Sequence, residues 1–133
     1  MRHEALRPVE ILPSEVPGLI DELPALAALA TFGGGLAVSG AGELRVKESD
    51  RITMLVAGLR ALGADVEERH DGFVVAGGRR LAGGTAHASG DHRLAMAFAI
   101  AAIGATGDSR IRGAESVAIS YPGFFETLER LRQ

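Results

Sequence analysis

Three clusters of charged residues each precede a run of apolar residues with helical spacing. They are Asp21-Glu22, the segment from Lys47 to Arg51, and Asp91-His92-Arg93. The start of a helix carries free backbone N–H groups and the positive end of the helix dipole, and both favour a bound anion. The dipole disfavours cations in the first turn, so Arg51 and Arg93 break a local rule of helix stability. The pattern predicts an anion site.

A structural interpretation of these clusters stays open beside the functional one. Ser49 and Asp91 are residue types that cap helices. Arg51 could pair with Glu48 at the surface, where an ion pair contributes little. The functional interpretation expects the helix starts near Asp50 and Asp91 to face one another across one surface, with Lys47 and Glu48 nearby and Asp21 at its edge. Arg51 and Arg93 should then point the same way and repel each other. An empty site would then be strained or hydrated.

The apolar pattern predicts elements that would position these clusters. Short strands are expected at 9–12, 36–38, 65–68, 72–75, 85–89 and 110–112. Helices are expected at 24–32, 52–62, 91–105 and 122–132, the last with Phe124, Phe125, Leu128 and Leu131 inward. Pro24 suits the first turn of a new helix, and Asp71-Gly72 between two strands is a hairpin signal.

The chain also repeats itself. Asp21 and Asp91 are 70 positions apart, and the Ala- and Leu-rich segments that follow them superpose. Self-similarity at a fixed period indicates repeated supersecondary units. We therefore expect an α/β chain forming a single partial domain over 1–133, with a first βαβαββ unit at 8–78 and a second, truncated unit at 84–133. The Ala-rich helix faces should pack together with the sheets outside.

Composition excludes several classes of protein. The chain has 133 residues, 47% of them hydrophobic, which suits one domain with a core. A net charge of −3 argues against a nucleic-acid or membrane-surface binder. There is no cysteine, no signal-like start and no apolar run long enough to span a bilayer, so we expect a cytoplasmic protein. His87 and His92 with Asp91 fit no common ligand spacing, so no metal site is expected.

Four segments resemble, in order and spacing, the motifs of the 5-enolpyruvylshikimate-3-phosphate (EPSP) synthases. They are LIDELP at 19–24, LRVKESDR at 44–51, GDHRLAM at 90–96 and SYPGFF at 120–125. The resemblance extends from about Arg7 to Leu131. A related branch, the UDP-N-acetylglucosamine enolpyruvyl transferases, shares the fold. The second and third segments favour the shikimate branch.

The resemblance implies an activity, a fold and a missing part. The family transfers the enolpyruvyl group of phosphoenolpyruvate to the 5-hydroxyl of shikimate 3-phosphate and releases phosphate, without a cofactor, in aromatic amino acid biosynthesis. Its two domains consist of βαβαββ units, and N-terminal strands complete the domain that this chain resembles. We therefore expect the isolated chain to be inactive. The alternative is a non-catalytic fragment that binds an anionic ligand weakly or assembles with the missing segment.

The resemblance also implies catalytic residues. Asp21 resembles the carboxylate that accepts the proton of the attacking hydroxyl. Glu48 resembles the acid that serves proton transfer at the methylene carbon of phosphoenolpyruvate. Lys47 resembles the residue that contacts both the shikimate hydroxyl and the reacting centre. Asp21 and Lys47 are therefore expected to bind substrate as well as to take part in catalysis.

The implied binding residues hold the phosphoenolpyruvate carboxylate. Arg51 and Arg93 resemble the pair that does so, with His92 beside them, and planar guanidinium groups suit a carboxylate better than lysine would. Two positions depart from the family pattern. Ile119 stands where some members have a phosphate-binding lysine, and Glu43 stands where some have an amide that touches the shikimate.

Overall fold

The structure is a computed structural model that describes residues 8–47, 49–78, 80–113 and 123–132. The strands within these ranges form two sheets. They are β1 (Val9–Ile11), β2 (Gly35–Val38), β3 (Val66–Arg69), β4 (Gly72–Ala76), β5 (Thr85–His87) and β6 (Arg110–Arg112). One sheet has the order β1-β2-β4-β3, with β1 parallel to β2 and β4 antiparallel to both of its neighbours. Strands β5 and β6 form a separate parallel pair.

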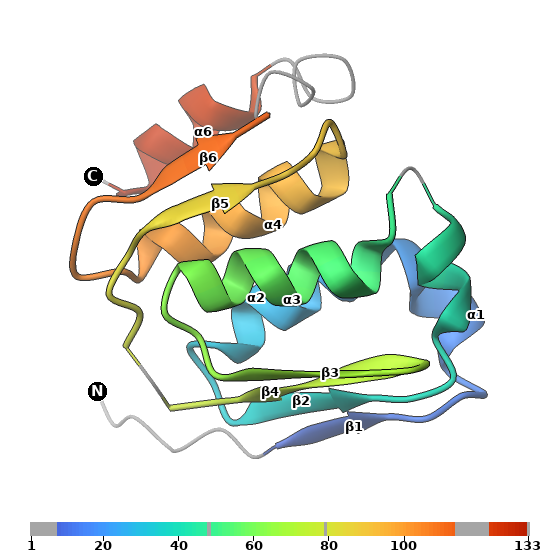
Figure 1. Cartoon of the computed structure of the whole chain (residues 1–133). Helices are drawn as coiled ribbons and strands as arrows, with labels where there is room; N and C mark the ends of the chain where they lie inside the picture. The colour runs from blue at the N-terminus through green and yellow to red at the C-terminus, as the bar shows by residue number, and fades with distance from the viewer. Residues whose placement is uncertain (1–7, 48, 79, 114–122, 133) are drawn as a thin grey trace.

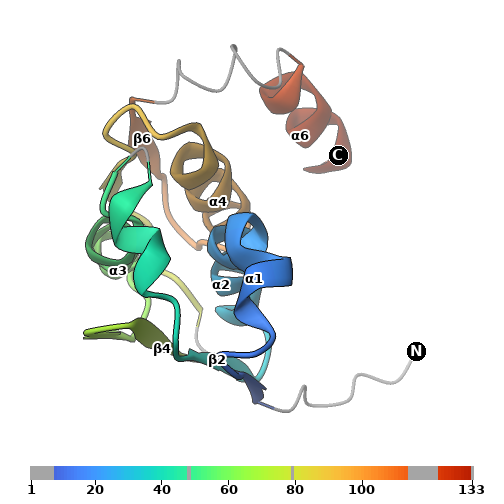
Figure 2. The same cartoon turned by 90° about the vertical axis from the view of Figure 1, so that its right-hand side faces the viewer.

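Helices connect and cover these strands. They are α1 (Val16–Leu19), α2 (Leu23–Ala30), α3 (Arg51–Ala61), α4 (His92–Ile103) and α6 (Phe124–Arg132), with 3₁₀ segments η1 (Ile20–Glu22) and η2 (Gly42–Val46). Helices α2, α3 and α4 begin at the same end of the molecule, on the right of Figure 1. Seen along their axes, α2, α3 and α4 lie next to one another above the four-stranded sheet (Figure 2). Helix α6 lies beyond α4, on the side away from that sheet.

The core lies between the helices and the inner faces of the sheets. The helices contribute small residues as well as large ones, and α2 and α4 pack along each other. On α3 a glycine, Gly58, lies directly against the ring of Phe98 on α4. Both residues are fully or almost fully buried. Small side chains thus let the helix axes approach closely, as the Ala-rich pattern predicted.

The element order agrees with the predicted α/β fold of repeated units. The chain runs β–α–β–α–β–β from β1 to β4, and then β–α–β–α from β5 to α6. Pro24 lies in the first turn of α2, where its missing N–H costs nothing. The division into units at 8–78 and 84–133 stays a prediction.

Most boundaries differ from the prediction by one or two residues, and for two of them the structure shows the reason. The hairpin between β3 and β4 turns at His70 and Asp71, because Gly72 already pairs with Arg69. A side chain at Gly72 would collide with the Val38 carbonyl on β2, so this glycine serves close strand packing rather than the turn. Strand β5 ends at His87 rather than Ser89, which has a left-handed φ of +53° and cannot continue a strand.

The last predicted helix is present from Phe124 to Arg132, and Phe124 packs against the core. The side chains of Phe125, Leu128 and Leu131, which were predicted to point inward, lie outside the described residues, as do Ile119 and the start of the SYPGFF segment.

The close packing at Gly58 generates a testable prediction. Alanine is a better helix former than glycine by about 1 kcal/mol, so Gly58→Ala would stabilise an open helix face. Here the added methyl group meets the Phe98 ring, and overpacking should outweigh that gain. We expect a net destabilisation of about 1–3 kcal/mol in urea unfolding. Gly42→Ala, where an added methyl group meets nothing, is the control. A stabilised Gly58→Ala variant would contradict this packing.

Candidate functional site

Asp91 is the N-cap of α4 and is fully buried, with 0% exposure. Its Oδ1 accepts hydrogen bonds from the backbone N–H groups of Arg93 at 3.0 Å and Leu94 at 3.4 Å. The sequence favours this geometry because Gly90 before it adopts a φ of +76°, which a glycine reaches without strain. The predicted capping role of Asp91 is therefore confirmed, but it is only part of what the residue does.

The second partner of Asp91 is Arg51, the first residue of α3. Arg51 donates from Nε to Asp91 Oδ2 at 2.8 Å and from Nη2 to Oδ1 at 3.3 Å. Its side chain is only 3% exposed. Arg51 is therefore part of a buried, two-pronged ion pair, and the alternative of a surface residue that contributes little is wrong. Glu48, its partner in that alternative, lies outside the described residues.

Ser49 has a different role from the predicted cap. Its hydroxyl donates to Asp91 Oδ2 at 2.9 Å. The N-cap of α3 is Asp50, whose Oδ1 accepts from the backbone N–H of Thr53 at 3.2 Å. Two successive residues in the chain thus serve two different helices, because Asp50 caps α3 and Ser49 reaches across to the cap of α4.

Asp21, in η1 just before α2, joins the same cluster. Its Oδ1 lies 3.5 Å from Nη1 of Arg51, and its backbone carbonyl accepts from Nη1 of Arg93 at 3.3 Å. The Asp21 side chain is 46% exposed. The structure therefore brings together Asp21, Arg51 and Arg93, which come from three segments far apart in the sequence. Their grouping at one end of the helix layer is what the helix starts predicted.

The reason to expect strain in an empty site does not hold for Arg51. Repulsion between guanidinium groups and helix dipoles was the reason to expect it. The structure places the carboxylate of Asp91 against Arg51, and that of Asp21 nearby, so the cationic charge is offset without any ligand. Sequence reasoning missed this because Arg51 and Asp91 are 40 positions apart, and no local spacing links them.

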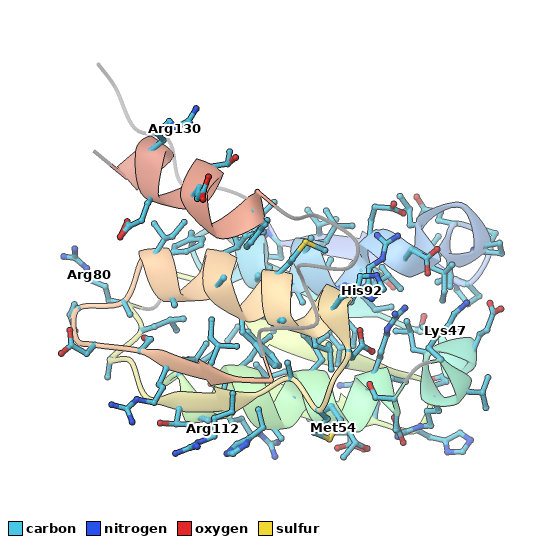
Figure 3. All side chains as sticks on the ribbon, turned by 90° about the horizontal axis from the view of Figure 1, so that it is seen from above. Lys47, Met54, Arg80, His92, Arg112 and Arg130 are labelled. Atoms are coloured by element: carbon cyan, nitrogen blue, oxygen red, sulfur yellow. The ribbon has the colours of Figure 1, made fainter. Side chains whose placement is uncertain are left out.

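Lys47 and His92 lie at the same end of the molecule as this cluster. Figure 3, the view from above, shows both labelled side chains at the end where the helices begin, far from Arg80. Lys47 Nζ is 3.6 Å from Glu43 Oε1, and its side chain is 27% exposed. His92 is half-buried in the first turn of α4.

The segment that carries Lys47 is held by Arg45, a residue that sequence analysis did not single out. Its guanidinium group donates to the His70 carbonyl at 2.8 Å and the Arg69 carbonyl at 2.8 Å at the hairpin turn. It also contacts Asp50 Oδ2 at 3.0 Å and Glu68 Oε2 at 3.2 Å. The chain on one side of Lys47 is thus fastened to the β3–β4 hairpin, and on the other side Ser49 is fastened to α4.

Two carboxyl groups of this region have shifted pKa values. Burial alone would raise the pKa of Asp91, but hydrogen bonds from Arg51 and Ser49, the Arg51 charge and the Leu94 N–H outweigh it and lower that pKa. Burial would likewise raise the pKa of Asp50, and the hydrogen bonds from Thr53 and Arg45 with the Arg45 charge lower it. Both groups are therefore held as carboxylates at neutral pH.

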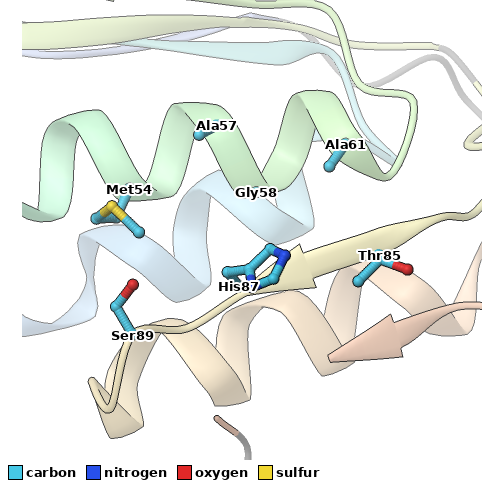
Figure 4. Close-up of a pocket in the computed structure, with 7 residues that line it drawn as sticks. All are labelled: Met54, Ala57, Gly58, Ala61, Thr85, His87 and Ser89. Atoms are coloured by element: carbon cyan, nitrogen blue, oxygen red, sulfur yellow. The ribbon is translucent and has the colours of Figure 1, made fainter. Parts of the chain in front are cut away.

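Other features of the described residues lie outside this cluster. A shallow cavity of about 370 Å³ lies between α3 and β5 (Figure 4). Its lining is mostly apolar and comprises Met54, Ala57, Gly58, Ala61, Thr85, His87 and Ser89. In the part of the chain that the structure describes, no group of three or more His, Asp or Glu residues is arranged to hold a metal ion. Within the same ranges, no helix has both the length and the apolar character needed to cross a membrane.

Comparison with known proteins identifies the family. The family model described as EPSP synthase (3-phosphoshikimate 1-carboxyvinyltransferase) matches residues 1–128. The chain belongs to the EPSP synthase family. A 3-phosphoshikimate 1-carboxyvinyltransferase of Roseiflexus castenholzii is 48% identical over 134 residues, covering 100% of this chain and 31% of the relative. One from Koribacter versatilis is 54% identical over 114 residues, covering 85% of this chain and 27% of the relative.

Solved structures agree. An EPSP synthase from Acinetobacter baumannii superposes with a TM-score of 0.88 at 38% identity, over 95% of this chain and 30% of that chain. These proteins are named for the shikimate branch, which the LRVKESDR and GDHRLAM segments favoured. The chain thus spans about a third or less of the length of the EPSP synthases it matches, and it contains part of their fold.

The lowered pKa values generate a prediction about acid stability. A carboxyl group whose pKa is lower in the folded state binds protons more readily when unfolded, so its contribution is present above its unfolded pKa of about 4 and is lost as pH falls through the folded value. We expect the urea-unfolding free energy to fall below about pH 4, and Asp91→Asn to flatten that dependence. Asp108→Asn, at an exposed loop aspartate, is the control. The same pH slope in the wild type and Asp91→Asn would contradict the assignment.

Proposed function

We propose that this chain supplies one wall of an active site that transfers the enolpyruvyl group of phosphoenolpyruvate to the 5-hydroxyl of shikimate 3-phosphate, with release of phosphate. The observation that carries the proposal is the convergence of Arg51 and Arg93 on Asp21 at the N-terminal end of the helix layer. Two guanidinium groups beside a half-exposed carboxylate are suited to bind an anion next to a proton acceptor. The names of the relatives support the choice of reaction.

In this proposal Arg51 and Arg93 both bind the phosphoenolpyruvate carboxylate, but they contribute different interactions. The Nε and Nη2 atoms of Arg51 face Asp91, so that edge of its guanidinium group is not available to a ligand. Arg93 is half-buried, and among the described residues its Nη1 bonds to one backbone carbonyl, at 3.3 Å, a neutral and rather long contact. Arg93 therefore supplies the paired hydrogen bonds to the carboxylate, and Arg51 supplies charge and one side of the site.

Asp21 would accept the proton of the attacking hydroxyl. Its side chain is half-exposed, so a substrate can reach it, and Nη1 of Arg51 lies 3.5 Å from its Oδ1. Lys47 would bind the hydroxyl and the reacting centre, Glu48 would serve proton transfer at the methylene carbon, and His92 would lie beside the carboxylate. Each of these roles rests on the family resemblance.

The remaining part of the active site would come from sequence that this chain does not contain. The relatives are about three times as long, and we infer that their other residues grip the phosphate groups and close the site. The reaction would take place in the cytoplasm, as the composition predicted. The alternative remains a non-catalytic fragment that binds an anion weakly or assembles with the missing segment.

Binding of phosphoenolpyruvate to this chain tests the proposal. Arg93→Lys keeps the charge but removes the planar fork, so it should weaken binding roughly tenfold, as expected for one lost charged hydrogen bond. The measurement is a titration followed by the side-chain Nε–Hε NMR signals of the arginines. Arg112→Lys, at an exposed arginine on β6, is the matched control and should bind as the wild type does. Equal affinity in Arg93→Lys and Arg112→Lys would contradict the assignment.

Activity of the chain alone provides a second prediction. Without the rest of the site, substrate positioning and exclusion of water are both incomplete, so no turnover should be detected in a phosphate-release assay. Sustained turnover by the pure chain at about 1 s⁻¹ or faster, a rate typical of enzymes, would show that these residues suffice.

A further inference from the structure

The anion site contains a buried carboxylate that the proposed reaction does not use. Asp91 lies behind Arg51, is 0% exposed, and contacts the guanidinium group through both of its oxygens. We propose that Asp91 sets the charge selectivity of this site, favouring a planar monocarboxylate over a tetrahedral dianion. This inference rests on the proposed function, since it concerns the ligand class of the same site.

The first argument is charge. The described groups that meet at the site are two guanidinium groups, Arg51 and Arg93, and two carboxylates, Asp21 and Asp91. Asp91 is held ionised in a buried position, where its charge is poorly screened. Each additional negative charge on a ligand is therefore repelled by Asp91, and a dianion is repelled about twice as strongly as a monoanion.

The second argument is geometry. By taking the Nε and Nη2 edge of Arg51, Asp91 leaves that edge unable to face a ligand. A planar carboxylate needs one two-pronged donor edge, which Arg93 can supply, whereas a tetrahedral dianion spreads its charge over more oxygens and binds best where several donors surround it. Asp91 thus removes donors that a dianion would need, while it leaves the requirement of a carboxylate satisfied.

The chain offers a matched control for this role. Asp50 is also an N-cap, on α3, but it pairs with Arg45 and Thr53 rather than with Arg51. Asparagine caps helices about as well as aspartate does. Asp91→Asn and Asp50→Asn therefore remove the same charge from the same type of position on neighbouring helices, and only the first removes it from the partner of Arg51.

The experiment compares sulfate with acetate as ligands of the intact chain. Dissociation constants are measured at constant ionic strength from the arginine Nε–Hε NMR signals for the wild type, Asp91→Asn and Asp50→Asn. We expect Asp91→Asn to shift the affinity ratio toward sulfate by about tenfold, and Asp50→Asn to leave the ratio within about twofold of the wild type. A merely structural role would weaken both ligands equally.

The outcomes separate this inference from the proposed function. If the wild type binds acetate but Asp91→Asn leaves the ratio unchanged, or Asp50→Asn shifts it as much, the selectivity role is overturned and the anion site stands. If the wild type binds neither anion saturably, the anion site itself is contradicted. Should Asp91→Asn fail to fold, Asp91→Ser, which keeps a capping hydroxyl, is measured instead. Failure of both variants to fold would overturn the inference in favour of a purely structural role.

Discussion

The arrangement of the site depends on the buried carboxylate of Asp91. Five hydrogen bonds reach it: two from Arg51, one from the Ser49 hydroxyl and two from backbone N–H groups at the start of α4. A buried charge is costly unless it is paired and hydrogen-bonded, and here both conditions are met. The carboxylate therefore fixes the start of α4, the side chain of Arg51 on α3 and the end of the η2–α3 loop relative to one another.

Asp50 and Asp91, the N-caps of α3 and α4, form ion pairs that differ in burial and in the segments that they join. Asp50 and Arg45 are partly exposed and join the η2 segment to the hairpin, where an ion pair in contact with water is worth little by itself. Asp91 and Arg51 are buried, so each holds the other in one position. The first pair keeps the segment around Lys47 near the sheet, and the second carries the orientation of the proposed anion site. The Arg51–Asp91 pair therefore joins two helix starts and also belongs to the proposed anion site.

The sequence predicted most helix starts and strand positions because these depend on residues that are close together in the chain. The cap at Asp91, the approximate start of α3, the break before Pro24 and the approximate strand positions follow from periodicity, caps and the chemistry of proline. It also placed Asp21, Arg51 and Arg93 at one end of the layers, because helices that follow repeated strands begin on the same side. Family resemblance, and not periodicity, suggested what these residues bind.

Contacts between segments far apart in the sequence could not be predicted from the sequence alone. The pairing of Arg51 with Asp91 and the grip of Arg45 on the hairpin turn join residues that no spacing rule connects. Gly72 was assigned to the turn because Asp-Gly is common there, whereas its real constraint is the Val38 carbonyl of a neighbouring strand. In each case the role of the residue depends on its tertiary contacts, which its residue type and its neighbours in the sequence do not determine.

The most direct test of this account is a double-mutant cycle between Arg51 and Asp91, measured by urea unfolding at neutral pH. Arg51→Met removes the ionic partner of the buried Asp91, and Asp91→Asn removes the two-pronged partner of the buried Arg51, so each should destabilise the chain by about 3–5 kcal/mol. The double variant leaves neither charge, and it should be more stable than the sum predicts by about 2 kcal/mol or more. Effects that add to within about 0.5 kcal/mol would show that the two residues act independently, which contradicts the account.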